Sequence, residues 1–101
     1  MRNQVAIDGR LLKRSALRYT PAGIPALDMV IGHNSIQIEA GAERQTRCEI
    51  ETVAIGDVAV RLSAHKLNHI LRVRGFLSRR SVTNQKLVLH VVDAKAMSTN
   101  E

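Results

Sequence analysis

The residues of this chain best able to do chemistry are its cations, and they are unevenly spread. The 101 residues carry a net charge of +6, although residues 21–60 hold six acidic and only two basic groups. From Val58 to Val92 there is no acidic residue, while the basic residues there are Arg61, Lys66, Arg72, Arg74, Arg79, Arg80 and Lys86. Such an acid-free basic stretch favours a polyanionic partner, above all nucleic acid, over a surface whose charge only aids solubility.

Three other groupings of reactive side chains predict neither a catalytic nor a metal site. His65 and His69 have helical i, i+4 spacing, but no glutamate follows the first histidine and no acidic or cysteine cluster completes a zinc site. Cys48 falls on the apolar side of an alternating pattern, so we expect a small buried side chain rather than a nucleophile. Glu49 and Glu51 share one strand face and are expected to point into solvent. We therefore expect no enzyme, no cofactor and no metal.

Length and composition indicate one small protein domain. No linker-like tract divides the chain, so we expect a single domain over residues 1–96 and a short flexible tail over residues 97–101. Because a chain of this size buries a modest share of its surface, oligomerisation would be a natural source of stability. No apolar run is long enough to cross a membrane, no signal peptide is visible, and a single cysteine suits a reducing compartment. The composition favours a cytoplasmic protein with no membrane association.

The elements that must position the cations are predicted to be strands. Apolar alternation predicts them over residues 4–13, 26–34, 44–55, 70–77 and 86–92. Gly9 interrupts the first strand and indicates a bulge or a bend at a barrel corner. Pro21 and Pro25, with Gly23 between them, predict a rigid turn ahead of the second strand.

A short helix is expected between the third and fourth strands. Gly56 ends the third strand, and Asp57 is predicted to cap a helix over residues 58–65. Residues 37–43 are predicted to form a loop or the end of a long hairpin, and residues 78–85 a basic polar loop. Three strands, a helix and two strands is the order of a five-stranded OB-fold barrel. We therefore predict an all-β fold of this kind with one small helix, ahead of a generic β-sandwich.

A series of short motifs runs along nearly the whole chain. The most specific is the turn from Pro21 to Pro25; the others are Asn3, Gly9, His33-x-Ser35-x-Gln37, Glu39-Ala40-Gly41, Arg44-Gln45, Cys48, Gly75-Phe76 and Val88-Leu89-His90. Each motif is weak alone, but their order and spacing together resemble the primosomal replication protein N (PriB) family. This family belongs to the bacterial single-stranded-DNA-binding OB-fold group.

The resemblance implies an OB-fold homodimer that binds single-stranded DNA during DNA replication. It implies an accessory role in the primosome at replication restart, where the protein would stimulate a PriA-like primosomal helicase and bridge to a DnaT-like helicase-loading protein. It also implies a location in the bacterial cytoplasm. By analogy with the wider group, the first strand, with Val5 and Ile7, is the expected dimer interface. Partner proteins would use part of the DNA-binding surface, so the two kinds of binding would compete.

The expected DNA contacts are cations on the loops with which OB folds bind oligonucleotides. They are Lys13, Arg14 and Arg18 after the first strand, Arg44 and Arg47 before or within the third, and Arg79, Arg80 and Lys86 around the last loop. Where the best-known family member has aromatic residues in the hairpin, this chain has Ala42 and Arg47, and its last loop is shorter. Base stacking contributes about 1–3 kcal/mol per base in such sites. The only aromatic residues here are Tyr19 and Phe76, and we expect Phe76 to pack in the core or an interface.

Phosphate contacts should therefore dominate binding, which predicts a weak to moderate, sequence-tolerant affinity with a steep salt dependence. Three alternatives differ in their expected sequence features. A general single-strand-binding protein would have a long tail with an acidic tip, whereas this chain stops after residues 96–101. An RNA-binding OB module would have an aromatic-rich strand face. A pure protein-interaction module would use the basic face to meet an acidic protein, and this alternative stays open.

Overall fold

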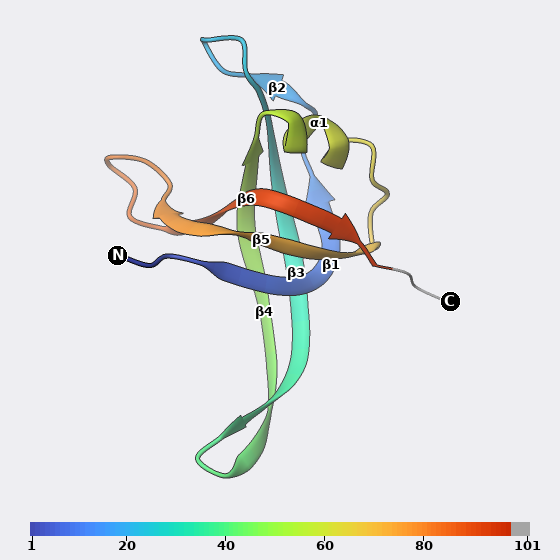
Figure 1. Cartoon of the computed structure of the whole chain (residues 1–101), viewed down its shortest axis with the longest axis vertical. Helices are drawn as coiled ribbons and strands as arrows, with labels where there is room; N and C mark the ends of the chain where they lie inside the picture. The colour runs from blue at the N-terminus through green and yellow to red at the C-terminus, as the bar shows by residue number, and fades with distance from the viewer. Residues whose placement is uncertain (98–101) are drawn as a thin grey trace.

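The computed structural model describes residues 1–97, and the rest of the expected tail, residues 98–101, lies outside the described residues. Its elements, shown in Figure 1, are β1 (Val5–Arg14), β2 (Arg18–Tyr19), β3 (Pro25–Glu39), β4 (Ala42–Ile55), α1 (Asp57–Leu62), β5 (Ile70–Arg79) and β6 (Leu87–Ala96). Within this part of the chain, no helix is long and apolar enough to span a membrane.

Five strands close into a barrel because β1 pairs with β5 and also with β3, the strand at the other end of the sheet. The strand order is β1-β5-β6-β4-β3, and a further β1–β3 pairing joins the two ends. The first part of β1 pairs with β5 from Val5 to Arg10, and the second part pairs with β3 from Arg10 to Arg14. The two-residue β2 only extends the edge of β3. The predicted OB-fold order of strands and helix is thus confirmed.

The corner of the barrel lies at Gly9, where β1 changes partner. A Cβ atom on Gly9 would lie 2.4 Å from Ile31 Cγ2 and 2.6 Å from the Gly32 carbonyl oxygen. Only a glycine allows the two backbones to approach so closely. The predicted bend is therefore confirmed, while the bulge itself falls a little later, between Leu11 and Lys13.

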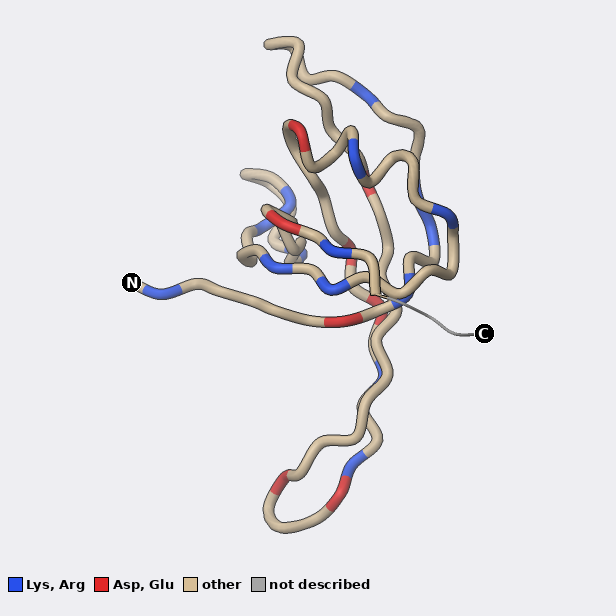
Figure 2. Tube along the Cα trace, turned by 45° about the vertical axis from the view of Figure 1, so that its right-hand side comes forward, with Lys and Arg blue, Asp and Glu red and all other residues tan. Residues whose placement is uncertain are grey.

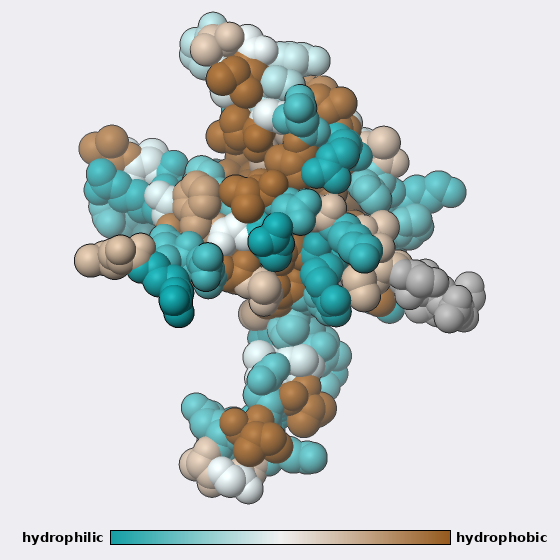
Figure 3. All heavy atoms as spheres, viewed as in Figure 1, coloured by the Kyte–Doolittle hydropathy of each residue, from teal (hydrophilic) through white to brown (hydrophobic). Residues whose placement is uncertain are grey.

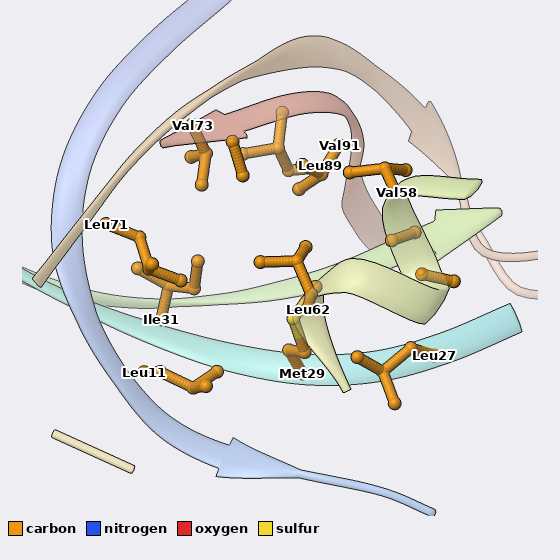
Figure 4. Packing of buried hydrophobic residues seen from close by; sticks show 13 residues of the cluster. Leu11, Leu27, Met29, Ile31, Val58, Leu62, Leu71, Val73, Leu89 and Val91 are labelled. Atoms are coloured by element: carbon orange, nitrogen blue, oxygen red, sulfur yellow. The ribbon is translucent and has the colours of Figure 1, made fainter. Parts of the chain in front are cut away.

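The core fills the barrel and is closed at one end by the helix. Leucine and isoleucine side chains from β1, β3, β5 and β6 point inward, as Figure 4 shows for Leu11, Ile31, Leu71 and Leu89, which are at most 1% exposed. Leu62 of α1 is equally buried and packs in the same cluster. Burial of side chains of this size contributes about 1.5–3 kcal/mol each, so the core holds the surrounding strands in a fixed arrangement.

The β3–β4 hairpin extends well beyond the barrel (Figure 1). The two strands pair without interruption from Ala26 opposite Ile55 to Glu39 opposite Ala42. Ala40 and Gly41 form the two-residue turn with φ values of 53° and 78°, the left-handed conformation that such hairpin turns need. Of the two alternatives for residues 37–43, the end of a long hairpin is therefore confirmed.

The helix differs from its prediction. Gly56 is the N-cap, with φ of 93°, and no side chain caps the first turn, so the prediction of Asp57 as cap is wrong. Asp57 is instead the first helical residue, because the glycine turns the chain one position earlier than expected. The helix ends at Leu62, so His65 lies beyond it and the helical spacing inferred for His65 and His69 is also wrong.

Candidate nucleic-acid interface

A groove on the barrel is lined by residues of β1, β3, β4, β5 and β6 and by the end of the loop that joins β5 to β6. Its lining includes Lys13 of β1, Val30 of β3, Glu51 of β4 and Lys86 of the loop. A second hollow adjoins it and is lined by Arg14, Asp28 and Arg80, again together with Lys13, Val30 and Glu51. The barrel thus brings together cations from the end of β1 and from residues about 70 positions later in the chain.

One carboxylate organises the loop side of this groove. Glu51 accepts from Arg80 through Oε1 and from Lys86 through Oε2. Hydrogen bonds hold the pKa of the Glu51 carboxyl below its usual value, and the bond from Lys86 has a larger effect than the bond from Arg80. The Arg80 amide donates to the Lys86 carbonyl oxygen at 2.9 Å, which closes the intervening loop. Two of the three cations predicted around this loop, Arg80 and Lys86, therefore converge on a single acidic group.

Other predicted cations are also held by carboxylates. Arg18 of β2 makes a two-pronged contact with Asp28 of β3, with distances of 2.9 and 3.1 Å. The hydrogen bond from Arg18 is the main reason why the pKa of Asp28 is lowered. At the far end of the long hairpin, Arg44 lies 2.8 Å from Glu39, and Figure 2 shows acidic and basic residues close together at this tip.

The remaining predicted cations have no carboxylate partner among residues 1–97. Lys13 faces both hollows, Arg14 donates to the His65 carbonyl oxygen, Arg47 projects from the hairpin opposite Asn34, and Arg79 ends β5. The structure thus gathers Lys13, Arg14, Arg80 and Lys86 around the groove. It places Arg18, Arg44, Arg47 and Arg79 outside the groove lining.

The predicted burial of Cys48 is wrong, and for Phe76 the structure rules out the core but leaves packing in an interface as a prediction. Cys48 is exposed, because it lies on the part of the hairpin that extends past the barrel, where neither face meets a core. Phe76 is 39% exposed and does not enter the core. Its ring instead stacks on His90 with a centroid separation of 4.8 Å and an interplanar angle of 7°. Tyr19, on β2, is 63% exposed.

Sequence reasoning missed the acidic side of the site. Glu51 was expected to point into solvent, yet its side chain is only 31% exposed and joins two cations. No local signal could have found this contact, because the partners are 29 and 35 positions away. On the outer surface of β1, β5 and β6, Arg72 pairs with Asp8 and Arg74 with Asp93, and these ion pairs were missed for the same reason. Within residues 1–97, no three His, Cys, Asp or Glu side chains gather where they could hold a metal ion.

Known proteins with the same fold and related sequences bind single-stranded DNA or act in replication restart. Residues 3–93 match a family described as "another single-strand binding protein family". The replication restart protein PriB of Bordetella pertussis is 35% identical over 96 residues, which are 95% of this chain and 90% of that protein. The same protein of Nitrosomonas europaea is 34% identical over 94 residues, covering 93% and 87%.

Solved structures agree with these sequence relationships. The structure of PriB from Ralstonia solanacearum superposes with a TM-score of 0.90 at 28% identity, covering 97% of this chain and 100% of that one. The single-stranded-DNA-binding protein of Thermus aquaticus shares the fold, with a TM-score of 0.79 at 22% identity over 97% of this chain and 51% of that one. The matched family is thus described by single-strand binding and the curated relatives by replication restart. This chain therefore belongs to the PriB family of replication restart proteins and has their single-strand-binding OB fold.

Proposed function

We propose that this protein binds the phosphate backbone of single-stranded DNA with the groove and with the two segments beside it, which are the end of β1 and the loop between β5 and β6. The observation that carries the proposal is the convergence of Lys13, Arg14, Arg80 and Lys86 on the groove and the hollow that adjoins it, from segments far apart in the chain. The DNA would continue over Arg18 and Arg79 next to the groove, and over Arg44 and Arg47 on the hairpin.

Backbone contacts rather than base stacking would provide most of the affinity. Phe76 already presents its ring to His90, which leaves Tyr19 as the one aromatic side chain without a ring partner in residues 1–97. Near the hairpin tip, Ile36 and Ile38 are 58% and 69% exposed, and Figure 3 shows hydrophobic side chains gathered there. These aliphatic side chains would contact base faces without recognising their sequence, so binding would be tolerant of sequence.

The same protein would act as a homodimer in the bacterial cytoplasm. From Val5 to Gly9, β1 pairs with β5 on one edge, and its other edge pairs with no strand of residues 1–97. Such an edge offers unpaired backbone groups to a second chain. Val5 and Ile7 lie on this segment and are only partly buried in the single chain, so each has apolar surface left to contact a second chain, which supports this edge as the dimer interface.

In replication restart, the bound DNA strand would be presented to a PriA-like primosomal helicase. A DnaT-like helicase-loading protein would then compete for part of the same basic surface. This competition follows from the overlap that a surface of this small size imposes on DNA and protein partners.

Fluorescence anisotropy with a labelled oligo(dT) strand tests the DNA site. Replacing Arg44, Arg47, Arg79 and Arg80 together by alanine should weaken binding by about tenfold or more, since several phosphate contacts are lost. A charge-matched control replaces cations outside the groove and hairpin: Arg2, Arg61, Lys66 and Lys95. Equal affinities of the two variants would contradict the placement of the site.

The same assay separates the other functions. Matched single-stranded DNA, duplex DNA and RNA strands compete with the labelled oligo(dT), and so does an acidic peptide. A preference for single-stranded DNA is the expected result. Equal competition by RNA would favour a general single-strand-binding protein, and competition by the peptide alone would favour a pure protein-interaction module.

A further inference from the structure

Glu51 occupies a central position in the candidate interface. Its carboxylate lines both the groove and the adjoining hollow, as Lys13 does. It projects from β4 at a point where the strand is paired with Val30 of β3. A group held on a paired strand of the barrel keeps its place, so its position in the groove is a property of the fold rather than of a mobile side loop.

The contacts of Glu51 resemble those that a DNA phosphate would make. One carboxylate oxygen accepts from the Arg80 guanidinium and the other from the Lys86 ammonium. A backbone phosphate likewise presents two anionic oxygens, and arginine and lysine are the side chains that bind it most often. Glu51 and a phosphate would therefore compete for the same two donors.

The loop does not need Glu51 in order to keep its shape. The Arg80 amide bonds to the Lys86 carbonyl, and Ser81 and Asn84 exchange backbone hydrogen bonds of 3.2 and 3.3 Å. The Asn84 side chain also accepts from the Lys86 amide at 3.0 Å. Because these bonds close the loop independently, the Glu51 contacts are available to be exchanged for other anions.

We propose that Glu51 is an internal competitor of single-stranded DNA: it neutralises Arg80 and Lys86 in the free protein, and a DNA phosphate must displace it to reach them. The inference rests on the proposed DNA-binding function and adds a residue that lowers its affinity. The lowered pKa of Glu51 agrees with a carboxylate that stays ionised at neutral pH.

The test compares Glu51→Gln with Glu49→Gln. Glu49 lies two residues earlier on the same face of β4, also lines the groove, and has no cationic partner within residues 1–97. Both substitutions remove one negative charge and keep the side-chain shape, so their difference isolates the ion pairs. Anisotropy titrations with labelled oligo(dT) at several salt concentrations give the affinity and its salt dependence for each variant.

Glu51→Gln should bind at least about threefold more tightly than the wild type near 0.1 M salt. Its plot of log affinity against log salt should steepen by about 0.7 for each cation that gains a phosphate partner. Glu49→Gln should gain clearly less affinity and keep the wild-type slope. Lys86→Ala should weaken DNA binding by a larger factor in the Glu51→Gln background than in the wild type, because Lys86 is paired with Glu51 only in the wild type.

Equal affinities of Glu51→Gln and Glu49→Gln would overturn the inference, because net charge alone would then explain the change. Weaker binding by Glu51→Gln would overturn it as well, since Glu51 would then support the site. Both outcomes leave the proposed function standing, because the wild type still binds. Absence of oligo(dT) binding by the wild type itself would instead overturn the proposed function and, with it, this inference. Thermal unfolding followed by circular dichroism confirms that each variant is folded.

Discussion

Raising the salt concentration should weaken DNA binding by an amount that the ion pairs determine. For single-stranded nucleic acid, the slope of log affinity against log salt is about −0.7 for each phosphate that a cation neutralises. Four of the eight candidate cations are held by carboxylates, and they are Arg18, Arg44, Arg80 and Lys86. If only the other four engage phosphates without cost, the slope is about −2.8, whereas all eight would give about −5.6.

These slopes predict clearly different losses of DNA affinity as the salt concentration rises. Between about 50 and about 200 mM salt, four phosphate contacts correspond to a loss of about 50-fold, and eight to about 2,000-fold. We expect a value near the lower figure, because a cation that stays paired with a carboxylate neutralises no phosphate and so releases no counterion from the DNA. Anisotropy with labelled oligo(dT) measures the slope directly, provided that the salt is changed at constant pH.

Two results would refute this reasoning. A slope flatter than about −1 would mean that phosphate contacts do not carry the binding and that exposed apolar side chains do. A slope near −5.6 would mean that the carboxylates give up their cations at no cost, which the contacts of Glu51 and Asp28 contradict.

Two further predictions concern the fold and the dimer. Gly75→Ala should lower the free energy of unfolding by about 1–3 kcal/mol, because the added Cβ would lie 1.7 Å from the His90 carbonyl oxygen. Urea denaturation measures this loss. Unchanged stability would show that β5 and β6 are not so close. Replacing Val5 and Ile7 by aspartate should convert a dimer to a monomer, as measured by size-exclusion chromatography with light scattering. The control Val60→Asp, on the exposed side of α1, should leave the dimer intact. A wild-type protein that is already monomeric would contradict the proposed interface.

Most of the barrel could be predicted from local patterns. Apolar alternation located the five barrel strands, because each strand has one face toward the core and one toward solvent. Pro21, Gly23 and Pro25 marked the turn, and Gly23 indeed has a φ of 80°. Gly9 indicated the corner, because a missing side chain is a local property of the sequence. The family resemblance rested on the same positions, and related proteins confirm it.

The long hairpin was harder to predict because alternation has a different meaning outside the barrel. Past the last β1–β3 pair, Arg10 with Gly32, the side chains of β3 and β4 no longer alternate between core and solvent, and Cys48 lies just beyond that point, opposite His33. This is why the burial expected for Cys48 was wrong, and why the second strand was predicted to end at residue 34 instead of Glu39 and the third to begin at residue 44 instead of Ala42. Apolar alternation indicates burial only where a strand packs against the core, and the sequence does not show where that packing ends.

The sequence by itself determined the kind of surface that this protein presents, since the acid-free basic stretch and the shortage of aromatic residues are facts of composition. It could identify cations near the predicted loops, but it treated each as an independent charge. Only the tertiary structure decided which of them are already neutralised. Closing the barrel sets Glu51 beside Arg80 and Lys86, and Asp28 beside Arg18. Electrostatic interaction depends on distance in space, and strand pairing rather than sequence separation sets that distance.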